Sequence, residues 1–297
     1  MRVAISGASG LIGSALTESL SADTHTVVAL VRRPSRGDNE SSWDPTTHTI
    51  DRDVIASADV VVNLAGASIG GKRFTQRYKQ VVRASRLDST ATIADAIAAV
   101  NPSVMLLQGS AMGYYGDRGV QELTERVEPG QGFLADVSRD WEAAAAPAVD
   151  AGANVAYLRT GLVLAGHGGF AQRLLPLVRR GLLGSLGGGD ARQSWITLED
   201  HVRGMRFLID KRHQGPANLV APQAASLADI IAAIAHALGS RPGLTVPSWL
   251  LRTVIGEAAD DLLASQAGVP GVLTRLGFEW SHPTLESAAR YVADSAK

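Results

Sequence analysis

The stretch Gly7-Ala8-Ser9-Gly10-Leu11-Ile12-Gly13 decides the fold of this chain. It follows an apolar segment at residues 1–6 that has the pattern of a buried strand, and it opens a helical pattern at 11–21. The first glycine permits a tight turn, the second lets a pyrophosphate approach the backbone, and the third lets the helix pack closely on the sheet. Free N–H groups at the start of the helix attract phosphates. We predict dinucleotide binding by Gly7, Ser9, Gly10, Leu11, Ile12 and Gly13; the alternative is a purely structural turn.

The rest of the first half alternates apolar strand patterns with helical ones. Further strands are predicted at 26–31, 60–64, 104–108 and 154–158, and helices at 75–100 and 134–149. Apolar strands between helices are typical of a parallel sheet covered on both faces. The sequence therefore predicts an α/β fold with a doubly wound parallel sheet of the Rossmann type.

After residue 165 the alternation of strand and helix patterns gives way to glycine-rich and helical segments, which predicts a second, smaller and mainly helical domain. We expect residues 1–165 to form the dinucleotide-binding domain, with 196–222 returning to it. Residues 166–195 and 223–297 would form the C-terminal domain on the substrate side. A glycine-dense stretch at 184–189 is interpreted either as a linker or as a loop that closes over a ligand.

The composition excludes several classes of protein. The 297 residues carry 28 Lys+Arg and 29 Asp+Glu, giving a formal charge of −1, whereas nucleic acids and anionic membranes select basic surfaces. Cysteine is absent, which excludes disulfides and thiolate chemistry, and no histidines have the spacing of metal ligands, so no metal is expected. No apolar run reaches the roughly 18 residues of a membrane span. With no signal-peptide pattern at its start, the chain is expected to be cytoplasmic.

The end of the second predicted strand indicates which dinucleotide is bound. The stretch reads Val31-Arg32-Arg33-Pro34-Ser35 and lacks the acidic residue that holds the ribose hydroxyls in NAD sites. Guanidinium groups instead suit a 2′-phosphate. We predict NADP as the cofactor, with Arg32 a better candidate than Arg33 because it lies closer to the strand. The alternative is that both arginines simply face solvent.

Several motifs resemble those of extended short-chain dehydrogenases/reductases. Besides the glycine spacing, the stretches that carry this resemblance are Asn63-Leu64-Ala65-Gly66, Gly109-Ser110-Ala111-Met112-Gly113-Tyr114-Tyr115-Gly116 and Leu158-Arg159-Thr160-Gly161-Leu162-Val163-Leu164. Over nearly its whole length the chain resembles, more narrowly, the NAD(P)-dependent epimerase/dehydratase-like "epimerase family" proteins, which are similar to sugar-nucleotide epimerases. The narrower motifs are Lys72-Arg73-Phe74-Thr75, Ser85-Arg86-Leu87-Asp88-Ser89-Thr90, Ser194-Trp195-Ile196 and a terminal segment at about 246–292.

The resemblance implies a set of cofactor contacts. Relatives contact NADP through the positions that match Arg32, Leu64, Ala65, Arg86 and Val163, and the matching motifs add Gly66, Gly109 and Ser110. One loop departs from the family pattern. Relatives have Gln and an aromatic residue where this chain has Ala191 and Arg192, so the substrate is expected to differ if this loop touches it.

The usual acid/base pair of this superfamily, Tyr-x-x-x-Lys, is missing. The residues four positions after the five tyrosines are Val82, Arg118, Gly119, Gly161 and Ser295. By register the pair would fall at Leu134 and Ser138, and the accompanying serine would fall at Ala111. Ser110, Tyr114 and Tyr115 are therefore the candidate catalytic residues, as substitute proton donors. The alternative is that the tyrosines only close the end of their strand, and a Tyr114–Arg118 pair is a further option.

Three more residues are candidates for substrate binding. Lys72 and Arg73 could hold a phosphate or a carboxylate, or could form a solvated helix start. Trp195 could pack against the substrate or fill the seam between the domains. Glu199, Asp200 and His201 are interpreted as the exposed start of a helix, since acidic residues favour that position.

Two functions remain open from the sequence. One is an NADP-dependent oxidoreductase or epimerase that acts on a hydroxyl or carbonyl group of an unidentified small molecule. The other is an NADP-sensing or regulatory protein that has lost catalysis, which the missing Tyr-Lys pair favours. Pairing of the helix at 75–100 between two subunits would make a homodimer.

Overall fold

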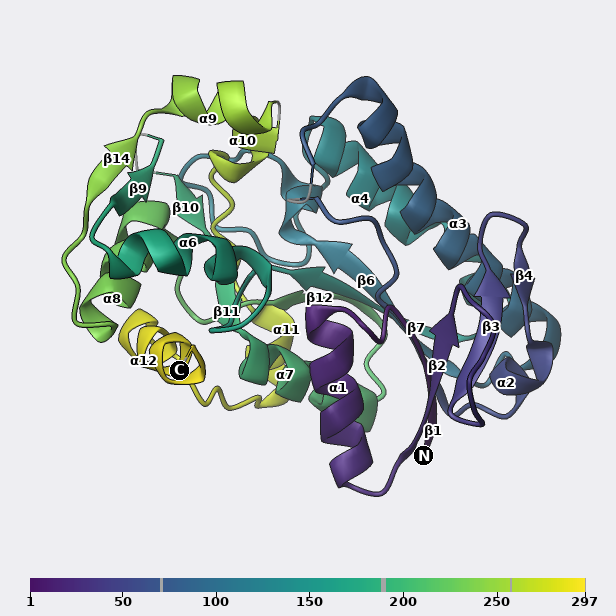
Figure 1. The fold of residues 1–297 in the computed structure, drawn as a ribbon. Helices are drawn as coiled ribbons and strands as arrows, with labels where there is room; N and C mark the ends of the chain where they lie inside the picture. Colours follow the sequence, from purple (N-terminus) through teal and green to yellow (C-terminus); the bar gives the residue numbers. More distant parts are fainter. Residues whose placement is uncertain (70–71, 188–190, 257, 297) are drawn as a thin grey trace.

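The computed structural model describes residues 1–69, 72–187, 191–256 and 258–296. A large sheet forms its centre, in the strand order β12-β7-β6-β5-β1-β2-β3-β4 (Figure 1). Its strands are β1 (Arg2–Ser6), β2 (Thr26–Val31), β3 (Glu40–Asp44), β4 (Thr49–Ile50), β5 (Val60–Asn63), β6 (Met105–Ala111), β7 (Asn154–Thr160) and β12 (Gly215–Leu219). All neighbouring strands are parallel except β3 and β4. The carboxyl ends of the parallel strands therefore meet along one edge.

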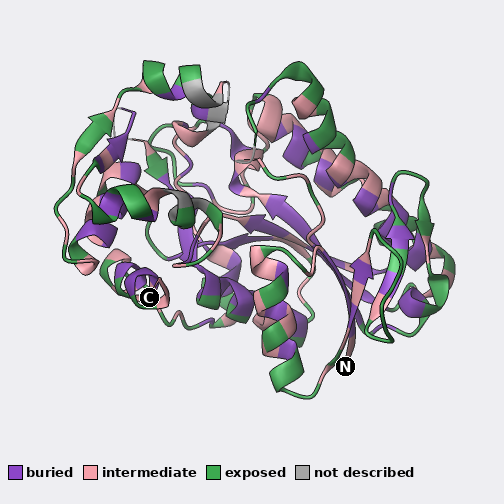
Figure 2. Ribbon diagram, viewed as in Figure 1, coloured by how far each residue is buried: buried purple, intermediate pink, exposed green. Residues whose placement is uncertain are grey.

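Helices cover both faces of this sheet, so the predicted doubly wound α/β class is confirmed. On one face α1 (Leu11–Ala22) and α7 (Leu198–Asp210) share a buried cluster with alternate residues of the strands. On the other face lie α2 (Arg52–Ala56), α3 (Gln76–Val100) and α5 (Ala146–Asp150), with α4 (Phe133–Ala143) beside α3 and β6. The strands between these layers are buried, whereas the outer helix surfaces are exposed (Figure 2).

Two local differences from the sequence prediction have simple causes. The short strand β3 was missed because its sequence, Glu40-Ser41-Ser42-Trp43-Asp44, is mostly polar and buries only alternate residues. The helix predicted at 134–149 is two helices, because the chain breaks after Ala143. The second, α5, begins with Pro147 in its first turn, where proline is tolerated.

The C-terminal part has its own buried cluster. The C-terminal part contains the short strands β9 (Leu183–Leu186), β10 (Arg192–Gln193), β13 (Ala225–Ser226) and β14 (Leu244–Val246). The strands β8 (Leu162–Leu164) and β11 (Trp195–Thr197) form a separate two-stranded sheet. The helices of the C-terminal part are α6 (Gly169–Arg179), α8 (Leu227–Ala237), α9 (Ser248–Ile255), α10 (Ala258–Leu262), α11 (Gly271–Leu276) and α12 (Leu285–Ser295). One cluster draws on both segments assigned to this domain from the sequence, and α7 and β12 return to the central sheet. The exact boundaries at 165, 195 and 222 stay a prediction.

A segment at residues 265–269 joins the C-terminal part to the central sheet. Its backbone is hydrogen bonded on one side to Arg118 and Leu123 and on the other side to Arg192 and Ser194. We call this segment the strap. Asn218 of β12 also contacts it, because its Nδ2 donates to the carbonyl oxygen of Val269 at 2.9 Å. The strap therefore lies against the carboxyl end of β12, and its Gly268 lies against Met112, the residue that follows β6.

The expectation that α7 begins with exposed charged residues is confirmed for Glu199 and is wrong for the two residues that follow it. Asp200 and His201 are fully buried. The Asp200 carboxylate accepts the backbone N–H groups of Ser281 and His282 at 2.7 and 2.8 Å, so it anchors the segment that leads into α12. The Nε2 atom of His201 lies 3.0 Å from Thr160 Oγ1, and burial lowers the pKa of His201 to about 3. The pattern of acidic residues at a helix start did not reveal this tertiary role.

The burial of His201 predicts a fold that is sensitive to acid. Because its pKa is lower in the folded protein than the usual 6.5, the unfolded chain takes up the proton more readily. The contribution of neutral His201 to the free energy of unfolding should be fully present above about pH 6.5. The free energy of unfolding should be about 2–3 kcal/mol lower by about pH 4.5. Urea unfolding across this range measures the effect. His201→Gln cannot titrate but retains a polar group toward Thr160, so it should flatten the pH dependence, and an unchanged slope would contradict this explanation.

Candidate nucleotide-binding and active site

A buried polar network holds the carboxyl edge of the sheet together. Ser6 Oγ donates to Asn63 Oδ1 at 2.6 Å, and Asn63 Nδ2 donates to Thr90 Oγ1 and to Gln108 Oε1, both at 3.0 Å. All four side chains are fully buried. They come from β1, β5, α3 and β6, so the network places the loops that follow these strands side by side.

The glycine loop has the geometry that phosphate binding requires. Gly7 has a φ of +71°, and a Cβ there would lie 2.7 Å from the carbonyl oxygen of Leu64; a Cβ at Gly13 would overlap the Gly7 carbonyl. Gly10 is exposed and forms the N-cap of α1 without a side-chain cap. The first N–H groups of α1 lack helical acceptors, and Ser9 is exposed beside them. The loop therefore leaves open backbone donors where a pyrophosphate would lie.

The two arginines after β2 have different surroundings. Arg33 makes a bidentate ion pair with Glu40, with its Nη2 2.6 Å from Oε1 and its Nη1 2.7 Å from Oε2. Arg32 is exposed and has no hydrogen bond or ion pair with any residue that the structure describes. Arg33 is therefore engaged by Glu40 while Arg32 is open to solvent, and the choice of Arg32 as the phosphate ligand stays a prediction.

Arg86 is a buried cation beneath the loop that follows β5. Its Nη1 donates to the carbonyl oxygens of Ala67 and Val82, both at 3.1 Å, and its guanidinium lies 4.9 Å from the Trp141 ring centroid. No carboxylate among the described residues pairs with it, and burial lowers its pKa to about 10. A Cβ at Gly66 would touch this guanidinium. Such a cation is suited to an anionic ligand lying over Gly66.

The remaining predicted cofactor contacts lie along the same edge. Leu64, Ala65 and Val163 are half-buried, and Gly109 packs against Trp141. The segment after β8 crosses the start of α1, because Gly168 and Gly169 both lie against the Leu11 side chain. Ile12 is half-buried in the same layer. The structure thus brings together the residues that the sequence predicted from distant motifs.

A buried ion pair lies at the ends of β6 and β7. Arg159 Nε and Nη2 donate to the two Glu142 carboxylate oxygens at 2.8 and 2.9 Å, and Ser110 Oγ donates to Glu142 Oε1 at 2.6 Å. The Arg159 guanidinium lies 3.5 Å from the centre of the Tyr114 ring. Burial alone would lower the Arg159 pKa, but its hydrogen bonds and attraction to Glu142 outweigh burial and raise that pKa. We call Ser110, Tyr114, Glu142 and Arg159 the strand-end cluster.

Sequence reasoning missed Glu142 and Arg159 as members of this site. The signal for Arg159 was available, because a charged residue inside an otherwise apolar strand requires a buried partner. Glu142 lies one helical turn after Ser138, the position at which the family resemblance predicts a lysine. Ser138 and Leu134 both face Gly113, close to the strand-end cluster. The two positions at which the family resemblance predicts the acid/base pair therefore lie near the strand end, and their side chains have no phenol or amine.

Tyr115 does not suit the catalytic role considered for it. Its side chain is fully buried, and its hydroxyl donates to Asn218 Oδ1 at 2.8 Å and accepts from Arg159 at 2.9 Å. Burial raises the pKa of Tyr115 to about 12. Arg118 donates to three backbone carbonyls, those of Tyr115, Glu128 and Pro129. Tyr115 therefore closes the strand end, and a Tyr114–Arg118 pair is not formed, whereas Tyr114 stays half-buried and accessible.

The predicted substrate residues do not gather at one point. Trp195 is 1% exposed and packs within the C-terminal cluster, which leaves its ring no open surface for a substrate in this structure. Lys72 and Arg73 are exposed. Arg73 lies against Gly256, beside a backbone bridge between Phe74 and Gly256. Residues 188–190 of the glycine-dense stretch lie outside the described residues, so its role as a lid is not tested.

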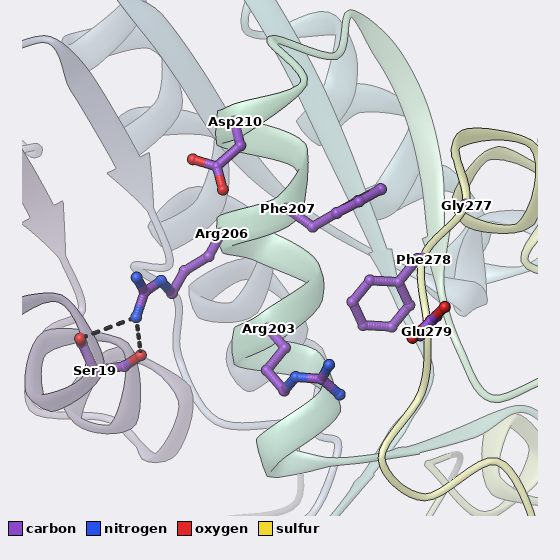
Figure 3. Close-up of a pocket in the computed structure, with 8 residues that line it drawn as sticks. All are labelled: Ser19, Arg203, Arg206, Phe207, Asp210, Gly277, Phe278 and Glu279. Carbon is purple, nitrogen blue, oxygen red and sulfur yellow. Dashed lines mark hydrogen bonds between the residues drawn. The ribbon is translucent and has the colours of Figure 1, made fainter. Parts of the chain in front are cut away.

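A hollow of about 450 Å³ lies elsewhere, between α1, α7 and the segment at 277–279 (Figure 3). Arg206 reaches across it and donates to the carbonyl and hydroxyl oxygens of Ser19 at 3.1 and 2.8 Å. The later turns of α1 and α7 lead into the amino ends of β2 and β12. This hollow is therefore remote from the carboxyl edge, and none of the predicted site residues lines it.

Comparison with known proteins agrees with this geometry. The model of the NAD dependent epimerase/dehydratase family matches residues 3–221, and that of a domain of unknown function, DUF1731, matches 246–292. An epimerase family protein of Mycobacterium bovis is 40% identical over 291 residues, covering 97% of this chain and 96% of its own. The crystal structure of the human epimerase family protein SDR39U1 with NADPH aligns over 99% of both chains, with a TM-score of 0.89 and 29% identity.

A further solved structure extends the comparison. A nucleoside-diphosphate sugar epimerase from Corynebacterium glutamicum is 34% identical with a TM-score of 0.80, covering 99% of this chain and 58% of that one. The fold and its glycine loop define a dinucleotide-binding protein of the extended short-chain dehydrogenase/reductase type. The chain belongs to the NAD dependent epimerase/dehydratase family, and its C-terminal part carries the DUF1731 domain.

Two glycine substitutions separate binding from folding at this site. Gly10 is exposed, and the atom nearest to an added Cβ would be the Gly7 carbonyl oxygen at 3.3 Å. Gly10→Val should therefore fold, but its side chain should block the pyrophosphate and reduce the affinity for NADPH and NADH alike by at least about 100-fold. Gly13→Ala should instead lower the melting temperature, because its methyl group would overlap the loop backbone. Calorimetric titration and thermal unfolding measure the two effects. Undisturbed binding in Gly10→Val would mean that the loop is only structural.

Proposed function

We propose that the chain is an NADP-dependent oxidoreductase or epimerase of the extended short-chain dehydrogenase/reductase type, acting on a hydroxyl or carbonyl group of a small molecule. The glycine loop, Arg32 and Arg86 offer donors and cations for the pyrophosphate, the 2′-phosphate and the rest of the nucleotide. The human relative that was crystallised with NADPH supports NADP as the cofactor. The observation that carries the enzymatic assignment is the strand-end cluster, in which an accessible phenol lies against a buried guanidinium.

Tyr114 is the group best placed to supply a proton. Bound NADPH supplies the hydride for reduction of a carbonyl carbon. Burial raises the pKa of Tyr114 although the Arg159 charge opposes this effect, so the phenol keeps its proton at neutral pH and can donate it to the carbonyl oxygen. The resulting phenolate would be stabilised by the Arg159 charge beside the ring and then reprotonated by water. Oxidation of an alcohol would follow the reverse course.

Ser110 has a different role in this proposal. Its hydroxyl proton points to Glu142, at an oxygen–oxygen distance of 2.6 Å. Glu142 is in turn fixed by the bidentate contact with Arg159. The Ser110 oxygen is therefore held in one orientation with a lone pair free for a hydrogen bond from a substrate hydroxyl. Ser110 would orient the substrate rather than protonate it.

A specific observation favours the second candidate function. Leu134 and Ser138 replace the usual tyrosine and lysine, and both face Gly113 at the strand end. A protein that only senses NADP would need the nucleotide site and no acid at all.

The cytoplasmic location and the homodimer through α3 stay predictions under either function, and the substrate is not identified. Among the described residues, no helix is long and apolar enough to cross a membrane.

NADPH oxidation tests the two candidates. Purified protein is incubated with NADPH and a panel of small carbonyl compounds, nucleoside-diphosphate sugars included, and absorbance at about 340 nm is followed. Tyr114→Phe keeps the ring over Arg159 but removes the proton, so turnover should fall by about 10²–10⁴-fold while the NADPH affinity stays unchanged. Tyr157→Phe, another half-buried tyrosine, is the matched control and should retain activity.

Two results would count against this proposal. Equal turnover in Tyr114→Phe and the unaltered protein would exclude Tyr114 as the acid. Tight NADPH binding with no oxidation across the whole panel would favour the sensing function instead.

A further inference from the structure

Glu40 organises the loop between β2 and β3. Its carboxylate accepts both terminal nitrogens of Arg33 and, at 2.8 Å, the backbone N–H of Arg36. The hydrogen bonds from Arg33 and from the Arg36 backbone hold the pKa of Glu40 at about 2. Glu40 is therefore ionised at any physiological pH, and it permanently engages one of the three arginines of this loop.

The other two arginines of the loop have free guanidinium groups. Arg32 and Arg36 are both exposed, and neither side chain has a hydrogen bond or ion pair with a residue that the structure describes. Arg33 is neutralised by Glu40, so the net attraction for an anion in this loop comes from its two neighbours on either side. A dianionic phosphate commonly takes charge-assisted hydrogen bonds from more than one arginine.

The fold of the loop brings Arg36 back to the end of β2. The Ser35 N–H donates to Ser42 Oγ at 2.9 Å, and the same oxygen donates to the Arg33 carbonyl at 3.0 Å. Ser42 is the register partner of Val31, the last residue of β2. The chain therefore folds back at Pro34, and Ser35 is held next to the end of β2. Arg32 is the first residue after that end and Arg36 directly follows Ser35, so the two arginines start close together. Neighbouring strands are only about 5 Å apart, so two long arginine side chains can reach one phosphate there.

We propose that Arg36 is a second ligand of the NADP 2′-phosphate beside Arg32, and that Glu40 is a positioning residue which withholds Arg33 and fixes Arg36. The inference rests on the NADP binding of the proposed function and assigns its specificity to particular side chains. Arg32 and Arg36 bind the phosphate, whereas Arg33 stabilises the loop through its ion pair with Glu40. Selection of NADP over NAD then depends on Arg36 being free to bind the phosphate while Arg33 stays paired with Glu40.

Three single-charge variants test this assignment. Arg32→Gln, Arg33→Gln and Arg36→Gln are titrated with NADPH, NADH and adenosine 2′,5′-bisphosphate. Arg32→Gln and Arg36→Gln should each weaken NADPH and the bisphosphate by about 10- to 100-fold and leave NADH within about twofold. Arg33→Gln should change NADPH affinity by less than about threefold. Arg52→Gln, an exposed arginine in α2, controls for the loss of one positive charge.

The role of Glu40 is tested by a double-mutant cycle. Glu40→Gln keeps an acceptor for the Arg36 N–H but releases Arg33 from its counter-ion. Arg33→Gln should therefore cost several-fold in NADPH affinity in the Glu40→Gln background, although it costs little in the unaltered chain. If Glu40 had a purely structural role, Glu40→Gln would reduce the affinities for NADH and NADPH equally. Its effect would then show no coupling to Arg33→Gln.

Each other outcome has a definite meaning. An NADPH affinity unchanged in Arg36→Gln, or equal losses in all three arginine variants, would overturn the assignment of Arg36. Strongest loss in Arg33→Gln would mean that Arg33 leaves Glu40 for the phosphate, which also overturns it. If the unaltered chain binds neither NADPH nor NADH, the proposed function itself fails.

Discussion

The buried amide of Asn63 is the constraint on which the site depends. It joins Ser6 at the end of β1 to Gln108 of β6 and Thr90 of α3, and every one of these side chains is out of contact with water. A buried polar network is stable only when its members satisfy one another, so the strands can meet in only one register at this edge. That register places the glycine loop and the strand-end cluster along one edge of the sheet, with Arg86 on the adjoining helix.

The strand-end cluster depends on the C-terminal domain as well. Asn218 donates to the strap at Val269 and to Leu123, and accepts from the Tyr115 hydroxyl. The Tyr115 hydroxyl accepts in turn from Arg159, which holds Glu142. A continuous chain of hydrogen bonds thus links the DUF1731 domain to the strand-end cluster. These contacts give the C-terminal domain a positioning role at the strand-end cluster.

Short-range patterns explain what could be predicted from the sequence. The glycine loop, the buried strands and the helix of residues 75–100 follow from spacing and periodicity within one segment, and they agree with the structure. The place of Arg33 could not be predicted in this way, because its partner Glu40 lies on a strand whose polar sequence gave no signal. The burial of His201 and the pairing of Arg159 with Glu142 likewise depend on segments far apart in the chain.

Equilibrium titration of the purified, unaltered protein with NADPH and with NADH tests the central claim, which is that this edge is built for a 2′-phosphorylated dinucleotide. We expect NADPH to bind at least about tenfold more tightly than NADH at physiological salt, and the difference to shrink as salt screens the exposed arginines. Equal affinities for the two nucleotides, or no binding of either, would contradict the account.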